Sequence, residues 1–294
     1  MENETFTISP EERIGVWERY PKIEFPDPIM EPVWYGRHDH VRIQDKWAIV
    51  DQNKGTAFAV CSIDYKIIRY ENIIFMVEKI VEELTGEYGR IQVYPRLLKD
   101  GGRLQVTLKF PDHPSLIREL DSIVPKVEVF SSYDLSSKLM GRFGAFQLKC
   151  TNGMGVWKSF RAFAKRHLQN LFLNDLGETI SAGLLVFGEQ VENWKKWTGI
   201  KIPQRLYDKM WDALPFSPAE KEKIENLPEI GTNLLLPDAL KSKELTVWDL
   251  NSVLTQFATH QVKSEVRRIE LEPEIAKNME EIAFLALAAT TRKH

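Results

Sequence analysis

Hydrophobic and polar residues alternate along much of the first half of the chain, with the period of two that is typical of β-strands. The segment 47–62 contains two such runs around Gly55, and the runs 90–98 and 103–110 flank a turn at 99–102. Glycine readily takes the positive φ that a tight turn needs. Each pair of runs therefore predicts a β-hairpin.

Helical spacing appears between the two hairpins. Apolar residues recur every three or four positions from Ile73 to Leu84, which predicts an amphipathic helix that ends at Gly86. A helical turn is expected from Leu116 to Ile123. Two alternating runs then follow, at 126–134 and 144–151, and predict further strands.

The second half of the chain replaces the strand pattern with helical spacing. Five helices are predicted, at residues 182–197, 204–214, 218–226, 247–262 and 274–289. This order indicates an α+β fold, with a mainly antiparallel sheet and packed helices, followed by a helical C-terminal region.

Proline is frequent in the N-terminal region, where it occupies five of the first 32 positions. Proline has no backbone N–H and interrupts regular elements. We therefore expect residues 1–32 to form an extended proline-rich arm, 33–175 an α+β core domain and 176–294 the helical region. The arm is expected to pack on its own chain or on a neighbouring subunit.

Composition places the chain among soluble globular proteins. It has 294 residues, of which 43% are hydrophobic and 28% charged, and its formal net charge is -3. No apolar run approaches the roughly 20 residues that a membrane helix needs, and the polar N-terminus has no signal-peptide pattern. Cys61 and Cys150 are too few for an all-cysteine zinc site. We expect a cytoplasmic protein with reduced cysteines, no cofactor and no membrane partner.

One segment departs from the acidic balance of the rest. From Leu135 to Asn174 there is no Asp or Glu, but there are seven Lys or Arg residues interleaved with aromatic rings. Cations bind the phosphates of single-stranded nucleic acid, and flat rings stack on its bases. The candidate nucleic-acid-binding residues are Lys138, Arg142, Phe146, Lys149, Lys158, Arg161, Phe163, Lys165 and Arg166.

Residues 157–171 of this acid-free segment are expected to form a helix. Its apolar positions would make a packing stripe, while Lys158, Arg161 and Lys165 would lie together on a free face. The alternative is an ordinary solvated helix face. Such a face usually mixes both signs of charge, which favours the binding interpretation.

A metal site is the first alternative chemistry. His38, Asp39 and His40 offer three potential ligands within three residues. No HExxH or CxxC motif accompanies them elsewhere in the chain. We therefore expect no metal site here.

A serine hydrolase site is the second alternative chemistry. Ser131, Ser132 and Asp134 could approach His113 or His167 in the fold. The glycine-flanked elbow that displays the nucleophile in many serine hydrolases is absent. No catalytic residue is therefore predicted.

Four short elements follow one another within residues 40–175: a Val-x-Ser-x-x-Tyr element before a helix, a Ser-x-Asp-x-Ser element, a Cys-x-Asn-Gly turn and a His that closes the basic segment. The residues are Val60, Ser62 and Tyr65; Ser132, Asp134 and Ser136; Cys150, Asn152 and Gly153; and His167. In these elements the chain resembles a phage and plasmid-like family, the domain of unknown function 932, with Tyr133 standing where a His is often found. The resemblance implies a bacteriophage or mobile-element origin and a role in DNA replication or recombination inside the host cell.

Together these features lead us to expect a DNA-metabolism protein of a bacteriophage or mobile element that is not an enzyme. It would bind single-stranded DNA and promote strand annealing or protection as a homo-oligomer in the host cytoplasm. Two alternatives stay open. One is a phage structural or assembly protein without nucleic-acid binding, and the other is a metal-dependent nuclease that uses His38, Asp39 and His40.

Overall fold

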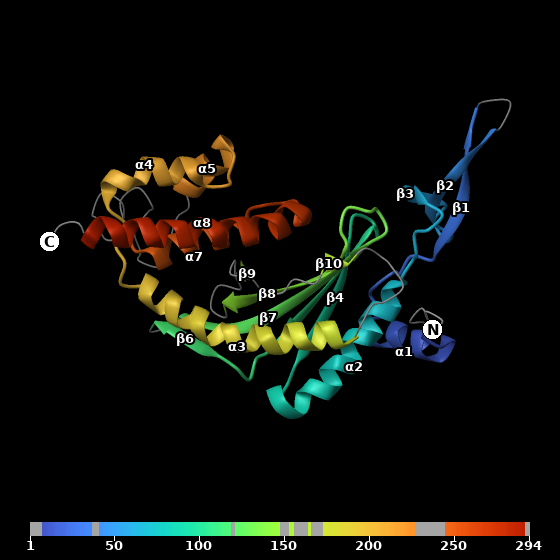
Figure 1. Ribbon diagram of the computed structural model, residues 1–294, viewed down its shortest axis with the longest axis horizontal. Coiled ribbons are helices and arrows are strands. Elements are labelled where there is room, and N and C mark those ends of the chain that lie inside the picture. Colours follow the sequence, from blue (N-terminus) through green and yellow to red (C-terminus); the bar gives the residue numbers. More distant parts are fainter. Residues whose placement is uncertain are drawn as a thin grey trace. The chain divides into compact units, whose positions relative to one another are not determined.

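The computed structural model describes residues 8–36, 41–118, 121–147, 153–155, 164–165, 173–226 and 245–291 (Figure 1). Its elements are, in chain order, α1 (Pro10–Arg19), β1 (Pro28–Tyr35), β2 (Val41–Asp51), β3 (Thr56–Ser62), α2 (Tyr70–Tyr88), β4 (Gln92–Leu98), β5 (Arg103–Lys109), β6 (Ser115–Arg118), β7 (Asp121–Ser132), β8 (Leu139–Gln147), β9 (Gly153–Gly155), β10 (Ala164–Lys165), α3 (Leu173–Trp197), α4 (Gln204–Ala213), α5 (Pro218–Glu225), α7 (Val247–His260) and α8 (Glu265–Thr291). The α+β fold and the helical C-terminal region are confirmed.

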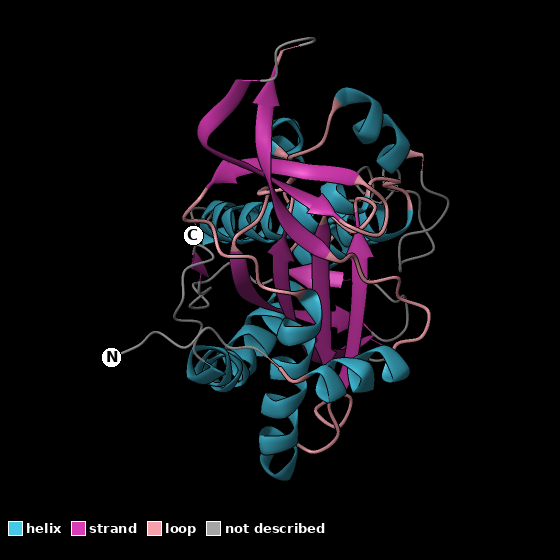
Figure 2. Cartoon of the chain, turned by 90° about the vertical axis from the view of Figure 1, so that its right-hand side faces the viewer, coloured by secondary structure: helices cyan, strands magenta, loops and turns pink. Residues whose placement is uncertain are grey.

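The strands form two sheets. A three-stranded sheet has the order β1-β2-β3, and a seven-stranded sheet has the order β10-β8-β7-β5-β4, with β6 paired to β7 and β9 paired to β8. The strand pairs with a described register are antiparallel, as predicted. Figure 2 shows the long strands of the larger sheet running side by side.

The chain divides into two compact units that interleave along the sequence. The first unit comprises Met1–Phe110, Val127–Arg142 and Arg161–Ser181, and the second comprises Pro111–Lys126, Phe143–Phe160 and Ala182–His294. The sequence instead predicts three parts that follow one another along the chain, with boundaries after residues 32 and 175. Strands β7 and β8 each contribute residues to both units.

Helix α1 occupies the region in which the prolines predict an extended arm. Ser9 caps the helix, because its Oγ accepts a hydrogen bond from Glu12 N at 3.2 Å while Glu12 Oε2 accepts one from Ser9 N at 2.8 Å. Pro10 stands at the first helical position, where the missing N–H would have no partner in any case. Ser-Pro-Glu-Glu is therefore a helix start. The helix packs on α2 and buries Val16 completely.

Helix α2 and the hairpins match their predictions closely. The buried positions of α2 include Ile73, Ile74 and Val77, and the helix continues two residues beyond the predicted end before Gly89 takes a φ of 67°. The turn between β4 and β5 places Asp100 and Gly101 at φ values of 51° and 90°. These are the positive angles that a tight hairpin turn requires.

The segment expected as a helical turn is a strand instead. Ser115–Arg118 forms β6 and pairs antiparallel with the start of β7. Leu116 is exposed while Ile117 is buried, which is the alternation of a strand and not the spacing of a helix. A short apolar run does not distinguish the two by itself.

Aromatic rings connect the elements of the second unit. Phe143 contacts Phe187 at a centroid distance of 6.0 Å, Phe187 contacts Trp194 at 6.3 Å, and Trp194 contacts Trp248 at 6.2 Å. Gly183 lies directly against the first ring, since a Cβ there would come within 2.3 Å of Phe143 Cδ2. Strand β8 and helix α3 therefore depend on a residue without a side chain to pack this closely.

Candidate nucleic-acid interface

Strand β8 positions three of the candidate binding residues. Lys138 immediately precedes it and is exposed, while Arg142 and Phe146 lie within it and are half-buried. Arg142 Nε donates a hydrogen bond to Glu128 Oε2 at 2.7 Å, and its guanidinium lies 4.9 Å from the Phe130 ring centroid. Of the three, Arg142 thus has a carboxylate partner within the protein.

This ion pair belongs to a chain of polar contacts across four neighbouring strands. Arg96 Nε on β4 donates to Gln105 Oε1 on β5 at 2.6 Å, and Gln105 Nε2 donates to Glu128 Oε1 on β7 at 2.6 Å. Arg142 on β8 completes the chain through the second oxygen of Glu128. Glu128 is only 4% exposed, and a buried carboxylate is tolerated because both of its oxygens accept hydrogen bonds.

The acid-free segment returns to the sheet at β10. Ala164 pairs with Met140 and Lys165 with Leu139, antiparallel to the beginning of β8. The sequence predicts a helix here, and the structure differs because the two residues pair with the open edge of β8, which offers backbone partners. The pairing brings the backbone of Lys165 alongside the residue that follows Lys138.

The other candidates lie outside the described residues. They are Lys149, Lys158, Arg161, Phe163 and Arg166, and of Lys165 only the backbone is described. The same holds for Cys150, Asn152 and His167 of the sequence motifs, and for His38, Asp39 and His40. The predicted roles of these residues stay predictions.

A compact loop precedes Lys138 and carries the Ser-x-Asp-x-Ser element. Asp134 Oδ1 accepts hydrogen bonds from the backbone N of Ser136, at 2.9 Å, and from its hydroxyl, while Asp134 Oδ2 lies 3.1 Å from Lys99 Nζ and 3.6 Å from Arg103 Nε. Burial alone would raise the pKa of Asp134, but the hydrogen bonds from Ser136 and Lys99 lower it. The loop is therefore held by an ionised carboxylate between two cations. Sequence reasoning missed Lys99 and Arg103 because they belong to a different hairpin.

Two stacked tyrosines, Tyr70 and Tyr133, form what we call the tyrosine clasp. Their ring planes are 10° apart with centroids at 3.9 Å. Tyr70 N donates to Tyr133 Oη at 3.0 Å, and Tyr133 N donates to Tyr70 Oη at 3.3 Å. Burial raises the pKa of both hydroxyls above the usual range. The clasp ties the first turn of α2 to the loop that follows β7.

A third tyrosine connects two of the sequence motifs directly. Tyr65 Oη donates to the backbone carbonyl of Ser132 at 3.1 Å. Ser132 Oγ accepts from Ser137 N at 3.0 Å and donates to Ser137 O at 2.9 Å, and Ser131 and Ser132 are both fully buried. The polar atoms of this motif therefore form hydrogen bonds that hold the loop in place, which is a structural role.

Residues from two elements of the sequence resemblance thus meet at one place in the fold. A family model described as Domain of unknown function (DUF932) matches residues 57–282. The chain belongs to this family. The matched range includes the tyrosine clasp and the whole acid-free segment, so both are parts of the domain that defines the family. No curated protein and no solved structure matches the chain significantly.

Two features of the described residues bear on the kind of site. Among them, no group of three or more His, Cys, Asp or Glu side chains is arranged to hold a metal ion. No helix in the described part of the chain is long and apolar enough to cross a membrane. Cys61, buried, is a free cysteine whose Sγ donates to Trp47 O at 3.6 Å.

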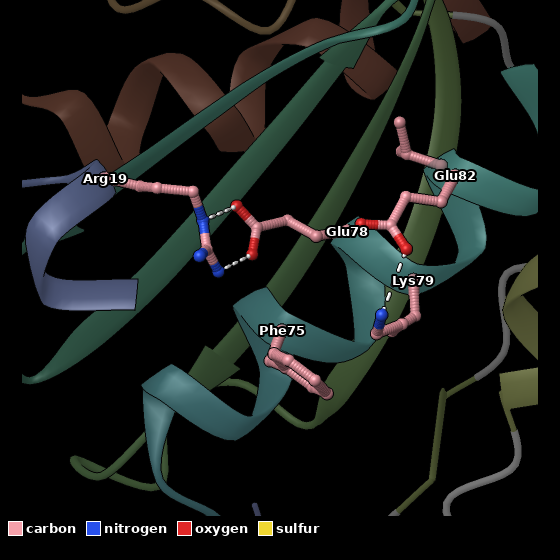
Figure 3. A pocket seen from close by; sticks show the side chains of 6 residues that line it. Arg19, Phe75, Glu78, Lys79 and Glu82 are labelled. Carbon is pink, nitrogen blue, oxygen red and sulfur yellow. Dashed lines mark hydrogen bonds and ion pairs between the residues drawn. The ribbon is translucent and has the colours of Figure 1, made fainter. Parts of the chain in front are cut away.

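A pocket of about 350 Å³ lies beside α1 and α2 and is lined by Arg19, Phe75, Glu78, Lys79, Val81 and Glu82 (Figure 3). Arg19 Nε donates to Glu78 Oε1 at 3.0 Å, and Tyr20 Oη donates to the same oxygen at 2.9 Å. Lys79 Nζ donates to Glu82 Oε2 at 3.1 Å. The two carboxylates pair with the two cations of the lining, so the pocket offers a phosphate no net positive charge.

Proposed function

We propose that the protein binds single-stranded nucleic acid and acts, without catalysing a reaction, in the DNA metabolism of a bacteriophage or mobile element. In the host cytoplasm it would promote strand annealing or protection as an oligomer. The observation that carries the proposal is the acid-free segment, because its backbone returns through β10 to the sheet edge beside the exposed Lys138.

The charge distribution supports this function more than the net charge does. The protein is acidic overall, yet seven basic residues fall within the forty residues from Leu135 to Asn174. Phosphate binding depends on a local concentration of cations, which release the counterions that surround the nucleic acid. Lys99 and Arg103 add two cations next to the loop that precedes Lys138 and outnumber its one carboxylate, Asp134.

The candidate residues should differ in their contributions. Lys138 is exposed, whereas the Arg142 side chain is 15% exposed and paired with Glu128. A cation that already has a carboxylate partner gains less from a phosphate. Lys138 should therefore matter more for binding than Arg142, whose main effect is on the sheet.

The experiment that tests the proposal is fluorescence anisotropy with a labelled oligothymidylate at several salt concentrations. We expect binding that weakens as salt rises. Replacing Lys158, Arg161 and Lys165 together by Gln should lower the salt slope by about two, at ~0.7 per phosphate contact. The matched control replaces Lys195, Lys196 and Lys209, three exposed lysines of the helical region, and should leave the slope unchanged.

Two results would contradict the proposal. One is the absence of binding by the parent protein at low salt. The other is an equal loss of slope in both triple variants, which would show that only net charge matters.

One observation favours the alternative of an assembly protein. The sheet β1-β2-β3 exposes four large apolar side chains near the connection between β1 and β2: Trp34 (54%), Tyr35 (75%), Val41 (62%) and Ile43 (38%). Tyr35 pairs with Val41, so these two lie on one face together with Ile43, whereas Trp34 pairs with Arg42 on the other face. We call Tyr35, Val41 and Ile43 the apolar ribbon patch. Clustered exposed apolar residues commonly mark a protein interface. This function needs no nucleic acid, so the anisotropy experiment separates it from the first.

A further inference from the structure

The β4–β5 hairpin has one polar and one apolar face. Directly paired residues of an antiparallel hairpin lie on the same face, and the register pairs Gln92 with Lys109, Tyr94 with Thr107 and Arg96 with Gln105. We call these six residues the polar hairpin face; the fourth pair in phase with them, Leu98 with Arg103, lies next to the turn. The intervening pairs are apolar: Val93 with Leu108, Pro95 with Val106 and Leu97 with Leu104. Leu104, Val106 and Leu108 are completely buried.

The polar hairpin face lies in a second concentration of positive charge. From Arg90 to Lys109 there are five basic residues and one acidic residue, Asp100, which stands in the turn. Neither strand contains an acid. Glu128 contacts the face through Gln105, and its two oxygens accept hydrogen bonds from Gln105 and Arg142.

Tyr94 presents an aromatic ring at this face with a fixed orientation. Its side chain is 47% exposed. The hydroxyl donates to Gln92 Oε1 at 2.9 Å, and Lys109 Nζ lies 5.1 Å from the ring centroid. A ring held in this way can stack on a base without losing much side-chain entropy, because its position is already restricted.

Helix α2 carries a similar pair in a setting where the cations are paired with carboxylates. Lys79 Nζ lies 5.4 Å from the Phe75 ring centroid, but Glu78 and Glu82 line the same pocket (Figure 3). An anion near this pair would meet two cations, Arg19 and Lys79, that already pair with the two carboxylates. An anion near Lys109 would meet strands that contain no acid. The lysine–aromatic pair alone therefore does not define the site; its surroundings do.

We propose that the polar hairpin face binds single-stranded nucleic acid, with the Tyr94 ring stacking on a base and Lys109 contacting a phosphate. The inference rests on the proposed function and adds to it a second contact surface on β4 and β5. A single strand is the fitting ligand because its bases are accessible for stacking, while those of a duplex are paired and stacked on each other. Arg96, which is half-buried on the same face, extends the positive charge along β4.

The test compares two labelled probes of equal length, oligothymidylate and an abasic strand with the same phosphates. Tyr94→Ala should weaken binding to oligothymidylate by at least about fivefold, the lower limit for loss of one stacked base. It should leave binding to the abasic strand nearly unchanged. Tyr94→Phe keeps the ring and should bind oligothymidylate within about twofold of the parent, since stacking does not require the hydroxyl.

Lys109 is tested separately through the salt dependence. Lys109→Gln should reduce the slope by about 0.7, the value for one phosphate contact. Lys79→Gln removes an equal charge from the matched lysine–aromatic pair and should leave the slope as it is. This comparison still decides the inference if Tyr94→Ala does not fold, which a melting curve would reveal.

The outcomes distinguish this inference from the proposed function. If the parent binds and both Tyr94→Ala and Lys109→Gln behave like it, the hairpin surface is overturned while single-strand binding stands. An equal loss on both probes for Tyr94→Ala overturns stacking. If the parent binds neither probe at low salt, both proposals fall.

Discussion

At the scale of single residues, the tyrosine clasp explains how two distant segments of the chain become one structure. Tyr133 Oη accepts a hydrogen bond from Tyr70 N, while Tyr133 N donates both to Tyr70 Oη and to Gly102 O. A buried N–H without a partner would destabilise the fold. The tyrosines are visible in the sequence, but their pairing is not. Tyr70 and Tyr133 are 63 positions apart, and periodicity carries no information about contacts at that separation.

The clasp predicts a specific dependence of stability on pH. The pKa of Tyr133 is raised by burial, so the contribution of its neutral hydroxyl is complete below the unfolded value of about 10 and declines as pH rises above it. Tyr133→Phe removes the acceptor for Tyr70 N and should lower the free energy of unfolding at pH 8 by roughly 1–3 kcal/mol. At pH 11 this difference should shrink by about 1.4 kcal/mol, because unfolded Tyr133 is ionised there.

Urea unfolding followed by circular dichroism at both pH values measures the effect. Comparison with the parent at each pH cancels the titration of the lysines and the other tyrosines. A difference that stays constant between pH 8 and pH 11 would show that the folded hydroxyl titrates normally, contrary to the burial argument.

At the scale of elements, the sequence predicts those helices and strands whose positions depend on the local spacing of apolar residues. The β4–β5 hairpin, α2, α4, α5 and α7 begin and end within a few residues of their predicted positions, because alternating and helical spacing act locally. Strand β2 begins six residues before its predicted start, and α3 and α8 each begin nine residues before theirs. Helix α1 and strand β6 are not predicted. The first depends on a capping box at Ser9 that outweighs the neighbouring prolines, and the second on pairing with β7.

The candidate site is predictable in part for the same reason. Alternation in 144–151 predicts a strand, and β8 covers its first four residues but begins five residues earlier, while residues 148–151 lie outside the described part of the chain. The partner of Arg142 is Glu128 on the neighbouring strand, and strand register decides that contact. The positive charge of the polar hairpin face can also be found from the sequence, since the segment from Arg90 to Lys109 contains five basic residues and one acid.

Helix α3 offers a matched pair of glycines that tests the packing on β8. A Cβ at Gly183 would lie 2.3 Å from Phe143 Cδ2, whereas a Cβ at Gly188 would meet nothing within 4 Å. Gly183→Ala should therefore lower the free energy of unfolding by roughly 1–3 kcal/mol through overpacking. Gly188→Ala should raise it by about 0.5–1 kcal/mol, because alanine favours the helix.

Chemical denaturation of the two variants provides the measurement, and a second substitution identifies the cause. Phe143→Leu in the Gly183→Ala background should recover part of the loss, because a smaller side chain makes room for the new methyl group. Equal stability of both glycine variants would mean that Gly183 does not pack against the ring.

At the scale of the whole molecule, charge and apolar surface are both unevenly distributed. Basic residues concentrate between Leu135 and Asn174 and on the β4–β5 hairpin, while the net charge of the chain is negative. Apolar surface is exposed on the β1-β2-β3 sheet, where Tyr35 pairs with Val41 and the two share a face. A nucleic-acid-binding oligomer needs both kinds of surface, and an assembly protein needs only the second.

The apolar ribbon patch therefore predicts self-association. In sedimentation velocity the parent should be larger than a monomer, and the double variant Tyr35→Ser, Val41→Ser should shift toward the monomer because it removes apolar area that association would bury. The control replaces Leu185 and Phe284 by Ser, two side chains that are 79% and 71% exposed on α3 and α8, and should keep the parent's mass.

A parent that sediments as a monomer, or a control that dissociates equally, would remove the patch as the interface. If the double variant is monomeric and still binds single-stranded DNA with the parent's salt slope, association and binding are separate properties. If the double variant loses both self-association and DNA binding, the bound DNA strand would span neighbouring subunits.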